Sequence, residues 1–372
     1  MLLIVSACIA TTAIVVQYAT SALAGWRLTA PCRVAPANPI PFISLVRPLC
    51  GVEEFSVETL ARSFALSYPR HEVIFCVADA QDPIIPFVRA AMACNPESPA
   101  SLMIGRETAS GNPKLDNLAK GFRAAAGEII VFTDSNLLLP ADYLEQVVSS
   151  WRPGIGLVSA PPFGSRPKGF WGEMECAILN THAARWQYAV DAVGFGFAQG
   201  KTLAFRKSDL DQGGFGTLGA EPAEDAAATK FIRARGKRVG LVAPAFAQPI
   251  GHRRARDVWS RHLRWSRLRR ATFPHLFVPE CLIGFVAPVA ACMFAAQELE
   301  LSPLAAGLAF ACVWFVPEAV LAVRAGWPMS PRMVLMLPLR DGLLLLIWLA
   351  TWFGRGFVWR GHDMRAVRAA EH

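Results

Sequence analysis

The sequence predicts an α/β domain with a mostly parallel, Rossmann-like sheet, joined to α-helical transmembrane segments. Apolar strand patterns alternate with helical patterns between residues 40 and 250, which is typical of a parallel sheet covered on both faces. Residues 1–26 and three blocks within 276–353 are apolar enough to cross a bilayer. A length of 372 residues accommodates one domain of ordinary size together with such segments.

The composition favours a membrane enzyme over a nucleic-acid-binding protein. Hydrophobic residues make up 53% of the chain and the mean hydropathy is +0.33, both high for a soluble enzyme. The formal charge is +8, and the stretch 253–270 alone contributes +7, with eight arginines against Asp257. Because this charge lies beside apolar segments and outside any nucleic-acid-binding motif, we expect no nucleic acid partner. The nine cysteines lack CxxC spacing, so we expect free thiols rather than a disulfide scaffold or a zinc site.

Residues 1–26 contain no charge, and Arg27 and Arg33 follow them. A signal peptide would carry basic residues before its apolar core, so the pattern predicts an uncleaved transmembrane anchor. Positive charge immediately after the anchor predicts that the following domain is cytoplasmic.

The soluble part, expected at 36–252, alternates strands and helices. Expected strands are 43–46, 72–79, 101–105, 128–136, 154–161, 202–206 and 239–250, and expected helices are 53–67, 82–94, 115–126 and the run that opens at Glu224-Asp225. Ligands of open α/β sheets bind at the carboxyl ends of the strands. Asp79 and Asp134 fall at two such ends.

The C-terminal part is expected to comprise an interfacial helix at 253–272, membrane helices at 276–353 and a basic cytoplasmic tail at 354–372. Arginine and tryptophan together favour the headgroup layer for the first of these. The apolar blocks are Leu276–Gln297, Leu301–Val323 and Met333–Phe353. Pro338, Arg340 and Asp341 interrupt the third block, which we therefore expect to be re-entrant or split into a hairpin. Arg340-Asp341 is the only charged pair expected inside the spans.

Three groups of residues could carry chemistry. Asp79 could accept hydrogen bonds from a base or ribose, and Asp134 could hold a divalent cation through hard oxygen ligands. Either aspartate could instead cap the following helix, but two in register on neighbouring strand ends favour a site. A carboxylate of Glu224-Asp225, at the start of a helix after a glycine-rich loop, could be a general base or could simply favour the helix dipole.

The third group is Arg261, Arg264 and Trp265 in the segment RHLRW. Residues three and four apart share one helix face, so two guanidiniums and an indole would be presented together. That face suits a diphosphate, although membrane anchoring would also explain the arginines.

In this order, the three acids and RHLRW resemble the D,D,D,(Q/R)xxRW pattern of family 2-type inverting glycosyltransferases. The closer resemblance is to the ceramide glucosyltransferases of family 21, whose last motif begins with Arg, as it does here. The matching segments are RPLCG (47–51, similar to KPLKG), CVADAQDP (76–83, CVQDHDDP), GNPKLDNL (111–118, INPKINNL), TDSN (133–136, CDSG), AED (223–225, AED) and RHLRWSRLR (261–269, RMIRWTKLR). The chain departs from the family pattern at Cys50, where the family has Lys, and at Asn136, where it has Gly.

The resemblance implies a GT-A fold and a role for each matching residue. Asp79 would bind the uridine part of a UDP-sugar, Asp134 would coordinate Mg²⁺ or Mn²⁺ on the diphosphate, and Asp225 would be the general base. Three further residues would lie around the donor, namely Lys114, Asn117 and, in THAARW, His182. The RxxRW residues, Arg261, Arg264 and Trp265, would close over the diphosphate and the acceptor.

The implied protein is a bacterial-type inverting glycosyltransferase of the inner membrane, with its catalytic domain in the cytoplasm. It would transfer glucose from UDP-glucose to a primary hydroxyl of ceramide, giving a β-glycolipid. Alternatives within this chemistry are a hopanoid or other lipid acceptor and UDP-N-acetylglucosamine or UDP-galactose as donor. A processive polysaccharide synthase shares the motif pattern. A non-catalytic sugar-nucleotide sensor or transporter subunit is an alternative of another class.

Overall fold

In the computed structural model, the described residues are 1–29, 40–107, 110, 112–211 and 213–354, together with the strand backbones 356–359 and 362–365. Arg33 and most of the basic tail lie outside them. The contacts divide the chain into two compact units. We call 27–163 with 190–249 the sheet unit, and 1–26 with 164–189 and 250–372 the helical unit. Residues 164–189, expected within the 36–252 domain, therefore group with the apolar helices.

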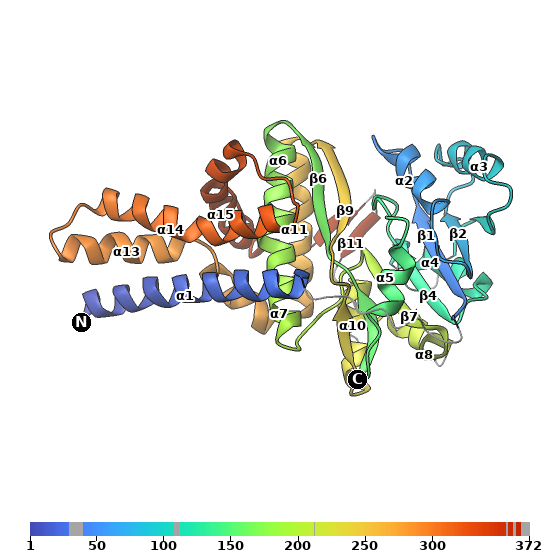
Figure 1. Ribbon diagram of the computed structural model, residues 1–372, viewed down its shortest axis with the longest axis horizontal. Helices are drawn as coiled ribbons and strands as arrows, with labels where there is room; N and C mark the ends of the chain where they lie inside the picture. The colour runs from blue at the N-terminus through green and yellow to red at the C-terminus, as the bar shows by residue number, and fades with distance from the viewer. Residues whose placement is uncertain are drawn as a thin grey trace. The chain divides into compact units, whose positions relative to one another are not determined.

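The sheet unit is built on a seven-stranded sheet of order β3-β2-β1-β4-β7-β5-β8 (Figure 1). β1 lies parallel to β2 and β4, and β2–β3 and β5–β8 are parallel pairs. β7 runs antiparallel to both of its neighbours, β4 and β5. The strands are β1 (Ile43–Leu49), β2 (His71–Val77), β3 (Ala100–Ile104), β4 (Ile129–Thr133), β5 (Ile155–Ser159), β7 (Thr202–Arg206) and β8 (Arg238–Leu241). The predicted α/β class with a mostly parallel sheet is confirmed.

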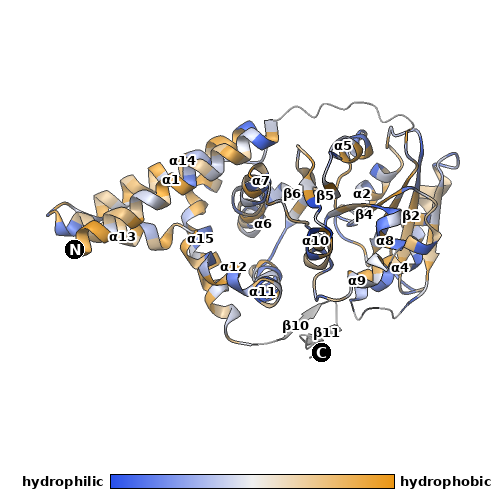
Figure 2. Ribbon diagram, turned by 90° about the horizontal axis from the view of Figure 1, so that it is seen from below, coloured by the Kyte–Doolittle hydropathy of each residue, from blue (hydrophilic) through white to orange (hydrophobic). Residues whose placement is uncertain are grey.

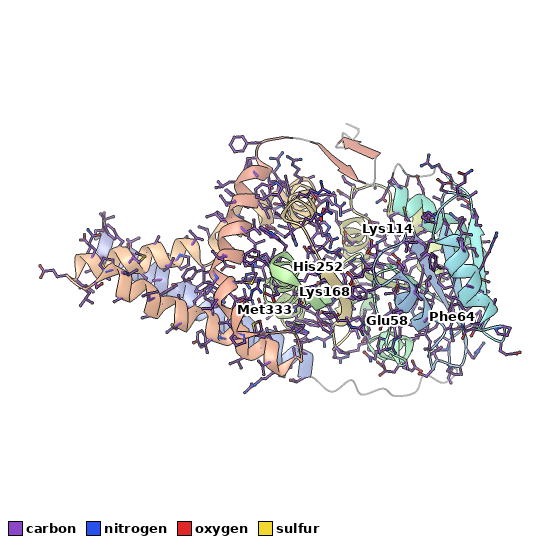
Figure 3. All side chains as sticks on the ribbon, turned by 90° about the horizontal axis from the view of Figure 1, so that it is seen from above. Glu58, Phe64, Lys114, Lys168, His252 and Met333 are labelled. Carbon is purple, nitrogen blue, oxygen red and sulfur yellow. The ribbon has the colours of Figure 1, made fainter. Side chains whose placement is uncertain are left out.

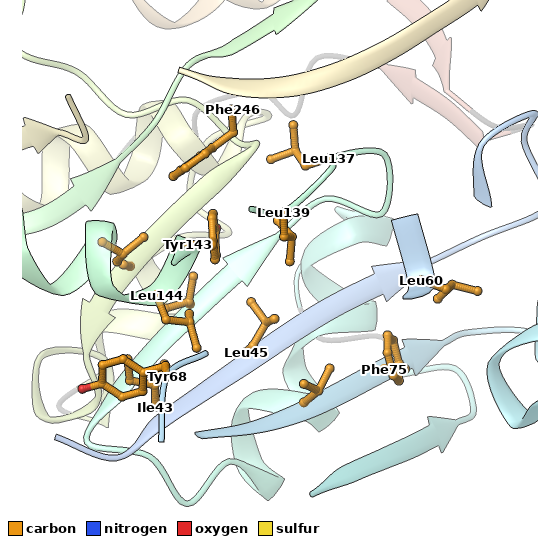
Figure 4. Close-up of a cluster of buried hydrophobic side chains, with 14 of the residues drawn as sticks. Ile43, Leu45, Leu60, Tyr68, Phe75, Leu137, Leu139, Tyr143, Leu144 and Phe246 are labelled. Carbon is orange, nitrogen blue, oxygen red and sulfur yellow. The ribbon is translucent and has the colours of Figure 1, made fainter. Parts of the chain in front are cut away.

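Helices cover both faces of this sheet. Consecutive residues of β1 point to opposite faces. Leu45 joins a core with Phe75 and Tyr143 (Figure 4). Val46 joins a second core with Phe132. Because each face is buried, the strands read as continuous apolar runs. The helices are α2 (Ser56–Ser63), α3 (Ile85–Ala93), α4 (Pro113–Ala124), α5 (Tyr143–Ser149), α8 (Lys207–Asp211), α9 (Gly214–Thr217) and α10 (Glu224–Ala234).

The single strand expected at 239–250 is wrong. The structure has β8 and then β9 (Phe246–His252), and Pro244 lies between them. Proline has no N–H to donate to a sheet, so the run breaks there. β9 pairs with β6 (Pro162–Lys168) in a separate two-stranded sheet.

The helical unit contains the long apolar helices, which are coloured orange in Figure 2. Within the described residues, four helical segments are long and apolar enough to cross a membrane. They are α1 (Leu2–Thr29), the segment Pro274–Glu298, α14 (Pro303–Arg324) and α15 (Pro331–Thr351). The second segment comprises α12 (Pro274–Phe277), η2 (Val278–Leu282) and α13 (Val286–Glu298).

The expectation that Met333–Phe353 is re-entrant or a hairpin is wrong. α15 is one helix that continues through Pro338. Arg340 and Asp341 do not interrupt it, because both are buried and paired: Arg340 Nη1 lies 2.6 Å from Glu318 Oε2, and Arg340 Nη2 lies 2.6 Å from Asp341 Oδ1. Glu318, within the second apolar block, is a further charge that the sequence reading overlooked. A buried charge is tolerated inside a helix bundle when a partner compensates it.

The predicted basic helix is α11 (Ala255–Thr272), and it packs along α15. Thr351 Oγ1 donates to Ser266 Oγ at 2.8 Å, and Arg270 Nη1 donates to Thr351 O at 2.6 Å. α11 is therefore held by side-chain contacts to a candidate membrane span. The unit also contains α6 (Gly169–Ala177), the π-helix η1 (Ile178–Ala184) and the part of α7 (Arg185–Ala192) up to Ala189. The strands β10 (Gly356–Trp359) and β11 (His362–Arg365) pair in its C-terminal part.

Candidate active site

Lys114 lies at the centre of a charged cluster in the sheet unit (labelled in Figure 3). Its ammonium nitrogen lies 2.7 Å from Asp134 Oδ1 and 2.7 Å from Glu224 Oε1, and it donates to Gly200 O at 2.7 Å. Lys114 belongs to the first turn of α4, where the Asn112 side chain caps the helix by accepting from Lys114 N at 3.0 Å. The cap fixes the turn, so the lysine is directed at two carboxylates from distant segments of the chain.

Asp134 follows β4 and has a second cation on its other oxygen. Lys201 Nζ lies 2.9 Å from Asp134 Oδ2 and donates to Asn136 Oδ1 at 2.8 Å. Burial by itself would raise the pKa of Asp134, but the ammonium groups of Lys114 and Lys201 outweigh it and hold that pKa well below its usual value. The carboxylate is therefore ionised throughout the physiological range.

Asp225 stands next to Glu224 in the first turn of α10. Its Oδ2 accepts from Gly200 N at 2.9 Å, and its Oδ1 accepts from Ala226 N at 2.8 Å. Burial and the neighbouring Glu224 raise the pKa of Asp225 to about 6, although Lys114 and the two backbone donors oppose them. A carboxylate with such a pKa is ionised at pH 7 and is basic enough to accept a proton in a reaction.

Gly200 is where these groups converge. A Cβ at this position would lie 2.8 Å from Glu224 Oε1, 3.2 Å from Lys114 Nζ and 3.5 Å from Asp225 Oδ2. The first distance is shorter than Cβ contacts found in proteins, so a side chain here would displace the Glu224 carboxylate. Glycine at this position lets the three charged groups lie close together.

Asp134 is the residue of the cluster that could offer oxygen ligands to a divalent cation. Across the described ranges, no three His, Cys, Asp or Glu side chains form a self-contained metal site. Mg²⁺ commonly takes only one or two protein carboxylates and completes its shell with substrate phosphates and water. Asp134 thus fits a cation that arrives on a diphosphate, and Lys201 would compete with that cation for Oδ2.

Arg47, in the segment RPLCG, holds the backbone that carries Asp134. Its guanidinium is fully buried and donates to Asp134 O at 3.0 Å and to Ser135 O at 3.1 Å. It also donates to Thr59 O at 2.8 Å, which ties the loop to α2. The loop after β4 therefore has a fixed position before any ligand binds.

Asp79 and Asn117 lie outside this charged cluster. Asp79 is exposed after β2, and its Oδ1 accepts from Gln81 N at 2.9 Å. β2 and β4 are separated by β1, so Asp79 and Asp134 do not lie on neighbouring strands as expected. Asn117 is buried on α4, and its Nδ2 donates to Cys76 O at 2.8 Å, joining the helix to β2.

The RxxRW residues belong to the helical unit, on α11. Arg261 Nη1 lies 2.9 Å from Glu175 Oε1, and His262 Nε2 lies 3.3 Å from Glu175 Oε2. Burial of Glu175 would raise its pKa, but these two partners lower it to about 2, so Glu175 is a permanent anchor for Arg261.

The other two motif residues are partly buried on α11. Arg264 lies one turn from Arg261, and the Trp265 ring meets the His262 ring edge-on at 5.1 Å. Trp265 also packs against a buried cluster that includes Leu179 and Met333. The indole is thus fixed by packing on neighbouring helices of the same unit.

His182 belongs to η1, in the same unit. Burial, followed by the charges of Arg340 and Arg185, lowers the pKa of His182 far below its usual value. The imidazole is therefore neutral at physiological pH. His182 thus lies in a π-helix, a rare structure that often occurs at functional positions.

The structure thus brings Lys114, Asp134 and the Glu224-Asp225 pair together, and it adds two residues that the sequence reading had not selected, Gly200 and Lys201. A partial signal was present, because Asn136 was recognised as a departure from the family pattern. Its side chain accepts from Lys201, so the unusual residue marked the position of the additional cation.

Comparisons with known proteins agree on the fold and the family. The profile described as "Glycosyl transferase family 21" matches residues 3–371. Ceramide glucosyltransferase 3 of Caenorhabditis elegans is 25% identical over 253 residues, covering 67% of this chain and 55% of that protein. Ceramide glucosyltransferase 1 of the same organism is 26% identical, with coverage of 67% and 54%. The chain therefore spans about half the length of these relatives.

Among solved structures, the mannosyltransferase PcManGT from Pyrobaculum calidifontis, in complex with GDP-Man and Mn²⁺, matches with a TM-score of 0.56 and 21% identity. The match covers 95% of this chain and 99% of that one. The predicted resemblance to glycosyltransferases of the GT-A type is confirmed at the level of the fold.

Proposed function

The chain belongs to glycosyl transferase family 21, and from that premise we propose that it is a membrane-bound inverting hexosyltransferase acting on a lipid. The donor is a UDP-sugar, with glucose as the first choice, and the acceptor is the primary hydroxyl of ceramide or of another lipid such as a hopanoid. The sheet unit is the cytoplasmic catalytic domain, 253–272 lies at the interface, and 276–353 spans the bilayer. The single observation that carries the proposal is the convergence of Asp225, Glu224 and Lys114 on Gly200.

In this proposal Asp225 removes the proton of the acceptor hydroxyl. The acceptor oxygen then forms a bond to the anomeric carbon on the face opposite the UDP group. The bond from that carbon to the phosphate oxygen breaks, and UDP leaves with the electron pair. The product is β-linked, and the proton rests on Asp225 Oδ until water removes it.

Lys114 and Lys201 balance the negative charge that develops on the leaving diphosphate. Each ammonium group already lies within 3 Å of Asp134 in the protein, so the positive charge is in place before the donor binds. Asp134 would hold a Mg²⁺ or Mn²⁺ ion on the diphosphate, which would supply further positive charge to the phosphate oxygens. Asp79 would contact the uridine, and Asn117 and His182 would support the donor pocket.

On α11, Arg261, Arg264 and Trp265 would close over the diphosphate and the acceptor. Glu175 gives Arg261 a fixed direction at low entropic cost, which is what a planar guanidinium needs to meet phosphate oxygens in pairs. The remaining arginines of the helix retain a membrane and packing role.

The test is to incubate membranes containing the full chain with labelled UDP-sugars and extracted lipids, and to identify products by mass spectrometry. The expected product is a lipid carrying one labelled hexose, which names donor and acceptor together. Membranes containing the Asp225→Asn variant serve as the matched control. Absence of a glycolipid with every UDP-sugar would overturn the proposal, and a labelled polymer would favour a processive synthase instead.

A further inference from the structure

The loop between α7 and β7 exposes three large apolar side chains within five residues. In the sequence VGFGF, the exposed fractions are 53% for Val193, 70% for Phe195 and 39% for Phe197. Scattered apolar residues are ordinary on a protein surface, whereas a group of three on one short loop indicates a surface that contacts something apolar. The contacts that the described residues make at the two ends of this loop indicate what the apolar side chains touch.

The N-terminal end of the loop is tied to the end of the first membrane helix. Arg27 Nε lies 2.6 Å from Asp191 Oδ2, and Arg27 Nη2 also donates to Leu241 O. Arg27 is the first charged residue after the uncharged stretch 1–26. α1 has 28 residues, so at about 1.5 Å per residue it exceeds the hydrocarbon thickness of about 30 Å. Arg27 therefore marks the level of the lipid headgroups. Val193, the first residue of the exposed loop, lies two positions after Asp191, whose carboxylate binds Arg27.

Guanidinium groups flank the same loop. Arg233 Nη2 donates to Phe195 O at 3.1 Å and to Gly196 O at 3.0 Å. The guanidinium of Arg238 stands beside Gly194, where an added Cβ would lie 3.8 Å from Arg238 Nη1. Exposed phenylalanine bordered by arginine is the composition that favours a layer of anionic headgroups above acyl chains.

The C-terminal end of the loop is fixed to the helix that carries Asp225. Ala198 N donates to Thr229 Oγ1 at 2.9 Å, and Thr229 Oγ1 donates to Asp225 O at 2.9 Å. Two residues later, Gly200 N donates to Asp225 Oδ2 at 2.9 Å. The loop and the start of α10 therefore form one hydrogen-bonded body, so the height of the loop above the bilayer sets the height of Asp225.

We propose that Val193–Phe197 is a membrane-docking loop, whose Phe195 and Phe197 side chains enter the headgroup layer of the bilayer that α1 crosses. The docking rests on geometry and charge alone. Its consequence rests on the proposed function: the loop would place the general base at the depth at which a lipid hydroxyl emerges from the membrane.

The sheet order provides a matched control position. The backbone of Gly196 abuts β8, since a Cβ there would lie 2.5 Å from Val239 O, and β8 is one end strand of the sheet. Phe87 is 42% exposed, close to the value for Phe197, and lies on α3, which packs against β3 at the opposite end. A docking loop at one edge should leave Phe87 in water.

The experiment places a genetically encoded fluorescent amino acid at position 195 or 87 of the full chain in nanodiscs. Spin-labelled lipids quench a probe in the headgroup layer, whereas iodide quenches a probe in water. We expect position 195 to lose most of its emission to the spin-labelled lipid and little to iodide, with the reverse at position 87. Iodide quenching at both positions would overturn the proposal, and so would equal lipid quenching at both.

Kinetics separate this proposal from the proposed function. Phe195→Ser is expected to raise the KM for the lipid acceptor several-fold and to leave the KM for the UDP-sugar unchanged. Transfer without lipid quenching at position 195 would remove the docking loop and leave the glycosyltransferase assignment intact. Lipid quenching at position 195 in a chain that transfers no sugar would support the docking loop and overturn the glycosyltransferase assignment.

Discussion

The sheet unit and the helical unit each contain two cations paired with two acids, but the two clusters differ in their remaining charge. In the sheet unit, Lys114 and Lys201 are paired with Asp134 and Glu224, and Asp225 adds a further carboxylate. The charged side chains of the ion pairs there are 12–24% exposed. Solvent and a ligand can therefore reach the charges of this cluster.

In the helical unit, Arg185 and Arg340 are paired with Glu318 and Asp341, and no side chain of these ion pairs is more than 3% exposed. Gln17 Nε2 donates to Glu318 Oε1 at 2.6 Å, so α1 is joined to α14 by the same network. The charges balance, and Arg185 also donates to Gln17 and Thr20 while Asp341 accepts from Phe285 N. The comparison shows that the number of charges does not identify a reactive site. The distinguishing feature is a carboxylate that none of these ion pairs uses, in a cluster whose charged side chains are partly exposed.

The largest expected effect comes from removing that additional carboxylate. Asp225→Asn should lower turnover by a factor of about 10²–10⁴, the range for loss of a general base, while UDP binding is retained. Turnover and the affinity for UDP would be measured on the same preparation. Glu221→Gln, which removes an ion pair with Lys230 on the surface, is the control. Normal turnover in Asp225→Asn would show that Asp225 is not the reactive carboxylate, contrary to the comparison of the two charged clusters.

The next largest effect tests the buried ion-pair cluster of the helical unit. Glu318→Ala removes one of the two acidic partners of Arg340 and the ion-pair partner of Arg185, and should lower the free energy of unfolding by about 3–5 kcal/mol, as for other broken buried pairs. The double variant Glu318→Leu with Arg340→Met should cost much less than the sum of the single changes. Thermal unfolding in detergent would measure both, with the exposed Glu298→Gln as control. Equal stability of Glu318→Ala and the native protein would mean that the network does not stabilise the helical unit.

A smaller effect is expected at Lys201. Lys201→Ala removes one charged hydrogen-bond donor from Asp134, so UDP affinity in a metal chelator should fall by about 1.5–3 kcal/mol. With Mn²⁺ present the loss should shrink, because the ion would gain the oxygen that Lys201 had occupied. Calorimetry with and without Mn²⁺ measures the difference. The control is Lys207→Ala, whose ammonium donates to Ala125 O instead. An identical loss in both conditions would contradict competition between Lys201 and the ion.

The smallest effect is the dependence on pH. The pKa of Asp225 is raised to about 6, so the base is ionised above that pH and becomes protonated below it. We expect kcat/KM to be level at neutral pH and to fall about tenfold for each pH unit below 6. In Asp225→Asn the residual rate should lack this acid limb. A native profile that is level down to pH 5 would mean that another group is the base.

Some of these features were predictable from local sequence. The β-branched runs ending at Val77 and Thr133 predicted strands, and the side chain that follows a parallel strand lies at the ligand-binding edge wherever that strand stands in the sheet. The start of α10 was equally readable, because Glu224-Asp225 before an alanine run is a typical first turn, whereas α4 begins two residues earlier than expected, at Pro113. These predictions depend on residues a few positions apart.

The sequence by itself determined the class of the fold, the apolar segments and the positions of Asp134 and Asp225, since each follows from short-range periodicity. Only the tertiary structure decided which charges meet. It brings Lys201 to a carboxylate 67 positions earlier, reverses β7 between parallel strands, and pairs Arg340 with Glu318 so that α15 is one continuous helix. The physical reason is that the cost of burying a charge depends on its partner, and the partner is chosen by the packing of distant elements.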